Sequence, residues 1–97
     1  MGVGDARQGL VNVSAGGYLD IRPPVNEEWV IHNIYHEYDV DLVWTNGTDE
    51  LVFDTDVGSG AYTAFAFHVT NSIWIRVINK DTTNARLVGY DGVCTKG

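Results

Sequence analysis

The sequence predicts an all-β domain, an antiparallel β-sandwich of seven to eight strands with jelly-roll-like or immunoglobulin-like connections. Its apolar runs are rich in β-branched and aromatic residues, which favour strands. Turn residues recur about every eight to twelve positions, the spacing of a sandwich or barrel. No stretch carries the apolar stripe of an amphipathic helix. Consecutive antiparallel strands in this number most simply form two packed sheets.

The chain is expected to form one domain, residues 1–97, because a second core would need about 50 residues of its own. Hydrophobic residues make up 44% of the chain and charged residues 20%, as in folded proteins. Residues 1–9 lack a strand pattern. We expect them to form an N-terminal arm that is flexible or docked on a partner.

Turn residues divide the chain into strands. Gly16-Gly17 separates the first two, and Pro23-Pro24 ends the second because proline has no N–H to donate to a sheet. Thr70-Asn71 and residues 80–84 mark later turns. The expected strands span 10–14, 18–22, 29–36, 40–45, 48–54, 62–69, 72–78 and 86–90.

A hairpin over residues 40–54 is the clearest local unit. Asn46-Gly47 is typical of a two-residue type I′ turn, in which both residues take positive φ. Closing the strands there predicts the pairs Val40 with Phe53, Leu42 with Leu51, Trp44 with Asp49, Asp41 with Val52, Val43 with Glu50 and Thr45 with Thr48. One face is then apolar and the other mixed, as in a half-buried pair.

The net charge of −7, with Lys and Arg scattered along the chain, disfavours nucleic acid and anionic membranes as partners. No apolar run approaches the ~20 residues of a membrane helix, and the first ten residues do not resemble a signal peptide. Synthesis in a cytoplasm is therefore expected, and the sequons at Asn12 and Asn46 are interpreted as chance matches. The single cysteine, Cys94, excludes an internal disulfide.

Two histidines invite a metal interpretation that their spacing disfavours. His32 and His36 are an even number of residues apart, so regular alternation would place both on one face. Four residues of strand span about 13 Å, too far for both imidazoles to reach one ion. We interpret them as residues of a sheet edge or subunit contact, and expect no cofactor or metal.

The other polar motifs are also weak evidence for a catalytic or metal site. His68 has no recognisable nucleophile setting, and the loop Asp54–Gly60 lacks the distal glutamate of an EF-hand, so an acidic loop is favoured over a calcium site. Glu27 and Glu28 are consecutive and diverge to opposite faces, so they cannot act as an acid–base pair. These patterns do not favour an enzyme.

The last candidate site is an excess of bulky side chains on the strand 72–78. If Ile73, Ile75 and Val77 face the core, then Trp74, Arg76 and Ile78 face outward. Trp and Arg on an outer face are typical interface anchors. The predicted partner interface therefore comprises Trp74, Arg76, Ile78, His32 and His36; coverage of both faces within the fold is the open alternative.

Several segments together resemble small virion proteins of tailed bacteriophages. They are residues 21–24 (Ile-Arg-Pro-Pro), 27–36 (Glu-Glu-Trp-Val-Ile-His-Asn-Ile-Tyr-His), 67–71 (Phe-His-Val-Thr-Asn) and 89–93 (Gly-Tyr-Asp-Gly-Val). The resemblance covers most of the chain from Tyr18 onward. It implies a β-sandwich without catalytic residues that binds the major capsid protein or other virion proteins, often as a trimer or in clusters.

The expected function is therefore that of a head decoration or head-associated protein of a virion, made in the host cytoplasm and located on the capsid surface. A tail, neck or fibre component would have the same composition and fold. The alternative from another class is a carbohydrate-binding module, in which Trp44, Trp74 or Tyr62 would stack on sugar rings.

Overall fold

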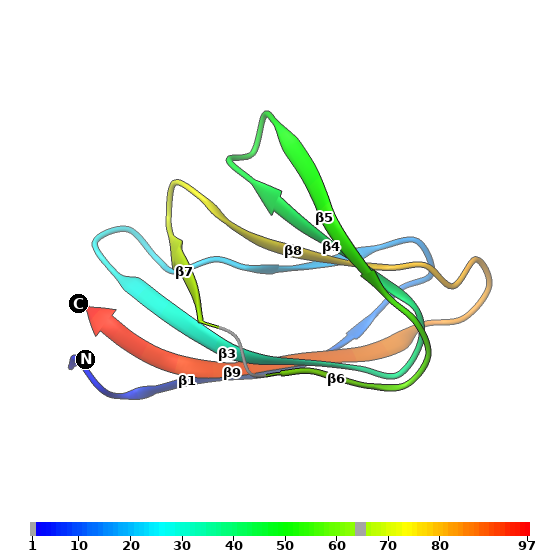
Figure 1. Cartoon of the computed structure of the whole chain (residues 1–97), viewed down its shortest axis with the longest axis horizontal. Helices are drawn as coiled ribbons and strands as arrows, with labels where there is room; N and C mark the ends of the chain where they lie inside the picture. The colour runs from blue at the N-terminus through cyan, green and yellow to red at the C-terminus, as the bar shows by residue number, and fades with distance from the viewer. Residues whose placement is uncertain (1, 64–65) are drawn as a thin grey trace.

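The computed structural model describes residues 2–63 and 66–97. These residues form nine strands in two antiparallel sheets that pack face to face (Figure 1). The strands are β1 (Ala6–Val13), β2 (Tyr18–Ile21), β3 (Glu28–His36), β4 (Val40–Thr45), β5 (Glu50–Asp56), β6 (Gly60–Tyr62), β7 (Phe67–Thr70), β8 (Trp74–Asn79) and β9 (Arg86–Lys96). The predicted β-sandwich is confirmed. No helix that could cross a membrane occurs in the described residues.

The strand pairing is that of a jelly roll. One sheet has the order β1-β9-β3, with β6 and β7 both paired to the other edge of β3, and the second sheet has the order β2-β8-β4-β5. The chain thus pairs from its ends inward: β1 with β9, β2 with β8, β3 with β6 and β7, and β4 with β5. Of the two connection patterns predicted, this is the jelly roll.

The core lies between the sheets and is built from inward-facing side chains of both. Its fully buried side chains include Ile31 and Ile34 from one sheet and Leu42, Ile75 and Val77 from the other. Burial of these aliphatic side chains is the main term that favours folding.

The expectation of an N-terminal arm over residues 1–9 is wrong for residues 6–9, because these residues belong to β1. This strand pairs with β9 from Ala6 to Val13, and the Gly4 backbone N donates to the Cys94 carbonyl at 2.7 Å. The alternation of apolar and polar residues that is typical of a strand is not apparent in this part of the sequence, because two inward positions of β1 do not carry apolar side chains. Arg7 is buried in an ion pair with Glu27, and Gly9 lies under the Tyr90 ring.

β9 is longer than predicted and runs through two glycines. A Cβ at Gly92 would lie 2.1 Å from the Val30 carbonyl oxygen, so the glycine marks a close approach of β3 rather than a turn. The strand predicted over residues 62–69 corresponds to β6 and β7, with residues 64–65 outside the described part.

The predicted register of the β4–β5 hairpin is wrong. Thr45 pairs with Glu50 and Trp44 with Leu51, and a bulge at Phe53 shifts the register again. The connection has four residues instead of two because the Asn46 side-chain oxygen accepts the backbone N–H groups of Thr48 and Asp49, at 2.9 and 2.7 Å. An asparagine that organises a turn through its own side chain leaves little sequence trace of the loop length.

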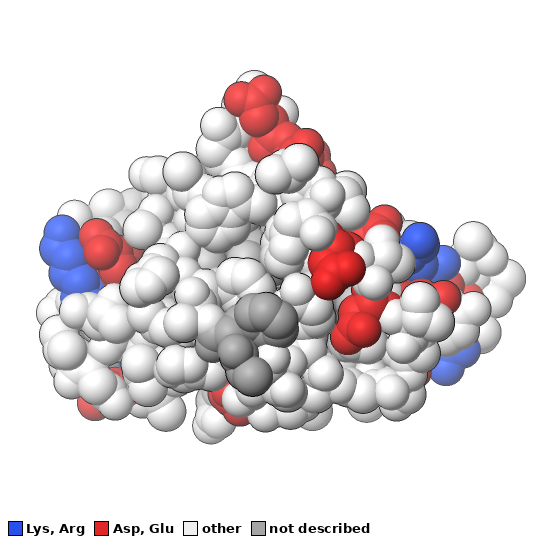
Figure 2. All heavy atoms as spheres, in the orientation of Figure 1, with Lys and Arg blue, Asp and Glu red and all other residues white. Residues whose placement is uncertain are grey.

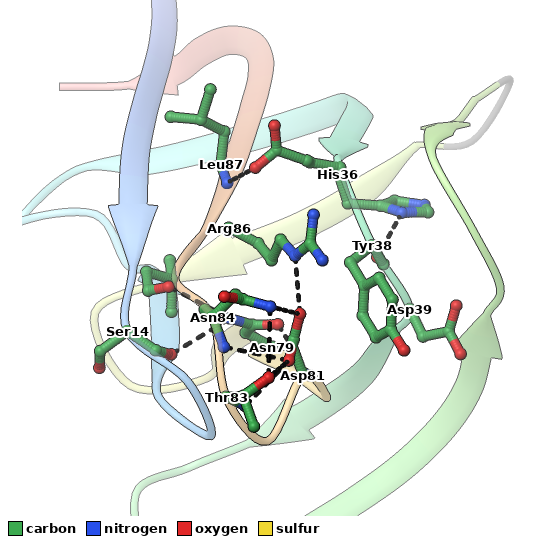
Figure 3. A network of polar contacts seen from close by, with 12 residues as sticks. Ser14, His36, Tyr38, Asp39, Asn79, Asp81, Thr83, Asn84, Arg86 and Leu87 are labelled. Carbon is green, nitrogen blue, oxygen red and sulfur yellow. Dashed lines mark hydrogen bonds and ion pairs between the residues drawn. The ribbon is translucent and has the colours of Figure 1, made fainter.

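A polar network fixes the loop between β8 and β9 (Figure 3). Asn79 is fully buried, and its Nδ2 donates to the carbonyls of Val13 and Asn84, each at 3.2 Å. Asp81 accepts the backbone N–H of Thr83 and the Arg86 Nε–H, at 2.9 and 2.8 Å. These bonds, strongest from Thr83 and then from Arg86, hold the pKa of Asp81 far below its ordinary value.

Candidate binding surface

The outer face of the four-stranded sheet carries the side chains predicted to bind a partner. Trp74, Arg76 and Ile78 alternate with the buried Ile75 and Val77, so their predicted direction agrees with the structure. Trp74, however, is only 3% exposed, and its description as an exposed anchor is wrong. The alternative left open by the sequence, that both faces of this strand are covered within the fold, is correct for Trp74.

Two groups cover Trp74. The Arg22 guanidinium lies 4.0 Å from the ring centroid, and the ring edge lies against Gly47 of the β4–β5 turn. Both come from segments distant in sequence, which strand alternation within residues 72–78 does not reveal.

Arg76 is also engaged inside the fold. Its Nε and Nη2 donate to the two carboxylate oxygens of Asp20 at 2.7 and 3.2 Å, and Glu50 lies 3.6 Å from Nη1. The guanidinium stacks 4.0 Å from the Tyr18 ring centroid. The hydrogen bonds that Arg76 donates to Asp20 raise the pKa of Arg76. Arg76 and the half-buried Ile78 therefore cover part of the outer face of this sheet.

The two histidines of the predicted interface do not share an environment. A register shift between Ile31 and Asn33 interrupts the alternation of β3, leaving His32 exposed and His36 buried. His36 Nε2 lies 2.7 Å from an Asp56 carboxylate oxygen, and Nδ1 lies 2.8 Å from the Gly58 carbonyl oxygen. The expectation that even spacing places both imidazoles on one face is wrong.

The acidic loop 54–60 is organised by contacts within the protein. Asp56 contacts His36, and Asp39 accepts the Gly58 N–H at 2.7 Å. Within residues 2–63 and 66–97, no group of three or more His, Cys, Asp and Glu side chains is arranged to hold a metal.

Glu27 and Glu28 serve separate contacts. Glu27 accepts hydrogen bonds from the Trp29 indole at 2.8 Å and from Arg7 Nη2 at 3.0 Å, and these bonds lower its pKa. Glu28 lies 3.7 Å from the Lys96 ammonium. The buried Cys94 thiol lies 3.7 Å from the Glu27 carboxylate. Glu27, Glu28 and Lys96 line one shallow hollow, but each carboxylate is already paired with a basic side chain of the fold.

An apolar groove opens on one side of the sandwich. It has a volume of about 370 Å³. Its lining comes from the inner face of β4 and β5 and from residues in and beside β7: Trp44, Leu51, Phe53, Ala66, Phe67 and His68. The groove therefore lies where the two sheets face each other, at the edges formed by β5 and β7.

The groove exists because the β4–β5 hairpin projects beyond the other sheet (Figure 1). Phe53 and Phe67 still meet across the sandwich, with ring centroids 5.5 Å apart, and Phe67 stacks on Tyr62 at 6.0 Å. Farther out on the hairpin, Leu51 pairs with Trp44 and is 62% exposed. Side chains with the inward direction of core residues thus remain accessible to solvent.

Negative charge frames this apolar surface. Every Lys and Arg lies outside residues 23–75, the segment that contains β3 to β7. Figure 2 shows acidic groups on the projecting hairpin and an uncharged area beside it. Glu50 and Asp56 contact Arg76 and His36, whereas Asp49 and Asp54 make no ion pair within the described part of the chain.

Sequence reasoning did not find this groove. The predicted hairpin places Trp44, Leu51 and Phe53 together on its apolar face, and Trp44 is in addition a candidate platform for sugars; neither prediction indicates a groove. Nothing in the alternation could have separated them, because groove and core residues point to the same side of their strands.

A second exposed apolar strip crosses the outer face of the five-stranded sheet. It comprises Leu10 of β1, Leu87 of β9 and Tyr35 of β3. The Tyr35 hydroxyl donates to Asp91 at 2.7 Å, which raises the pKa of the tyrosine. This strip lies on a sheet face, whereas the groove lies between two sheets.

Comparison with known proteins identifies no relative: no protein-family model matches the chain, and no curated protein matches its sequence. The fold alone does not assign a function, because jelly rolls occur in viral capsid proteins, lectins and cupins.

Proposed function

We propose that this chain is a non-enzymatic structural protein of a tailed-phage virion, which binds the assembled capsid and reinforces it through protein–protein contacts. The observation that carries the proposal is the solvent-accessible apolar groove between β5 and β7, framed by carboxylates. Exposed apolar surface rimmed by polar groups is a common feature of protein interaction sites.

The chemistry of the groove favours a protein partner over a sugar. Among its described lining residues, only Trp44 and His68 carry side-chain nitrogen or oxygen atoms. Sugars require several hydrogen bonds in addition to an aromatic platform. Of the three aromatic residues considered for stacking, Trp74 is buried and Tyr62 packs on Phe67, which leaves Trp44 alone.

The capsid is proposed as the partner because of the sequence resemblance to small virion proteins, together with the acidic composition. A jelly roll is compatible with this assignment, since the fold recurs in viral capsid proteins. A tail, neck or fibre component would use the same surface. Immunogold labelling of intact virions distinguishes the two locations.

The proposed mechanism is the addition of contact area across neighbouring shell subunits. A protein that binds the assembled lattice in preference to loose subunits stabilises the lattice by mass action. Several weak contacts per particle raise occupancy further. Self-association as a trimer or cluster belongs to the proposal, and sedimentation equilibrium of the purified chain measures it.

Co-sedimentation with phage heads tests the proposal. Purified protein is mixed with emptied heads of the encoding phage, and separately with their dissociated subunits. We expect saturable binding to the heads and little to the subunits. Failure to bind heads and intact virions alike would refute the assignment to the virion.

A further inference from the structure

We infer that the groove receives an extended segment of the partner protein, which pairs with the free edge of β5 and places one large apolar side chain between two Lys or Arg residues. The inference deepens the proposed function and rests on it for the identity of the partner. Its chemistry follows from the edge strand, the groove and the charges.

The edge of β5 is open to another strand. In the described residues, this seven-residue strand pairs with β4 alone. Natural edge strands are commonly protected by charged side chains, bulges or Pro. β5 has a bulge at Phe53 and three carboxylates, which repel an acidic strand and attract a basic one, but it has no Lys or Pro. Leu51 and Val52 are both exposed, on opposite faces of the strand. An extended peptide that binds such an edge gains main-chain hydrogen bonds, and a side-chain pocket gives it specificity.

The groove selects the side chain of the incoming strand. Its walls are aromatic and aliphatic, and its volume of about 370 Å³ lies at the small end of the range for ligand pockets, roughly 300–1,000 Å³. One large apolar side chain, inserted between Leu51 and Phe67, covers the exposed wall and removes it from water.

The carboxylates at the two ends of the groove favour basic residues on either side of the inserted apolar side chain. Asp49 lines a hollow adjoining the groove, together with Trp44 and Leu51. Asp54 lies beyond Phe53 at the other end and contacts the Tyr62 hydroxyl. Alternate residues of a strand share one face, about 7 Å apart. A segment with the order basic, any, apolar, any, basic therefore places a cation toward each carboxylate.

A second copy of this chain does not fit the edge. An antiparallel pairing of two β5 strands centred on Val52 places Glu50 opposite Asp54, and one centred on Phe53 places Glu50 opposite Asp56. Like charges directly opposite each other destabilise a sheet. Charge complementarity thus favours a basic segment of another protein.

Synthetic peptides test the inference without the phage. The probe is a capped nonapeptide with the central sequence Lys-Thr-Phe-Thr-Lys, titrated into ¹⁵N-labelled protein. We expect amide shifts in β5 and β7, and binding at least about tenfold weaker when both Lys are replaced by Glu or the Phe by Ser. Leu51→Glu should cause a similar loss, whereas Leu10→Glu, at a residue 69% exposed in the other sheet, should not.

A charge exchange provides an independent check. Asp49→Lys should weaken binding of the Lys peptide and strengthen binding of the Glu peptide, with the fold of each variant verified by its amide spectrum. Lack of binding at millimolar peptide, shifts centred on Leu10 and Tyr35, or equal binding of all three peptides would each overturn the inference.

Phage heads separate this inference from the proposed function. Heads that bind the wild type and the Leu51→Glu variant equally well contradict the groove as the docking site, but leave the virion assignment intact. Peptides that bind as expected, combined with heads that do not bind, support the groove and contradict the assignment.

Discussion

Trp74 illustrates how an outward-facing side chain becomes part of the folded interior. The indole is covered by Arg22 and by the β4–β5 turn. Replacing a buried Trp by Ala costs about 3–5 kcal/mol, so we expect Trp74→Ala to lose that much unfolding free energy in denaturant titrations. The neighbouring, exposed Ile73→Ala should change it by less than about 0.5 kcal/mol. Unchanged stability of Trp74→Ala would show that the indole is not part of the interior.

Asp81 links the stability of the β8–β9 loop to pH. Because its pKa is lowered in the folded state, its stabilising contribution is present above the unfolded pKa, about 3.9, and is lost as pH falls below that value. Asp81→Asn should be less stable than the wild type at pH 7, and its stability should fall less steeply between pH 4 and 2. Unfolding curves measured across this range check the effect; parallel curves for both proteins would contradict it.

The β4–β5 turn is the element on which both the groove and the cover of Trp74 depend. Gly47 has a φ of 92°, and a Cβ there would lie 3.2 Å from the indole of Trp74. Gly58 has a φ of 80° with open space around it, so it provides a matched control. Gly58→Ala should cost about 1–2 kcal/mol from backbone strain alone, and Gly47→Ala should cost more. An equal loss in both variants would contradict the packing of the turn on Trp74.

At the scale of elements, composition and turn spacing predicted the strands but not all of their partners. β3 and β4 were predicted nearly to the residue because their apolar runs are bounded by clear turns. β1 was missed in part because Arg7 and Gly9 occupy inward positions, and the hairpin register was wrong because side-chain hydrogen bonds of Asn46 define the turn.

The candidate site was less predictable than the strands because it depends on distances between sheets. Whether an inward-facing Leu51 is buried or exposed is decided by how far the β4–β5 hairpin projects past the facing sheet, not by the residue itself. The bulge in β3, which separates His32 from His36, likewise leaves no mark in the sequence.

At the scale of the whole molecule, a jelly roll leaves specific edges free. Pairing of the chain from its ends inward places β5 at the edge of one sheet and β6 and β7 at the edge of the other. The groove opens between β5 and β7, and both strands belong to the segment 23–75, which has no Lys or Arg. Apolar surface left in water does not contribute to folding, so its burial is available to stabilise a complex.

Hydrogen exchange of the chain bound to phage heads tests the docking surface most directly. Deuterium uptake, followed by mass spectrometry with and without heads, should fall in peptides that cover β5 and β7. It should be unchanged over β1 and the part of β9 that contains Leu87. Protection confined to Leu10, Tyr35 and Leu87 on the outer face of the five-stranded sheet, with none in β5, would contradict the account.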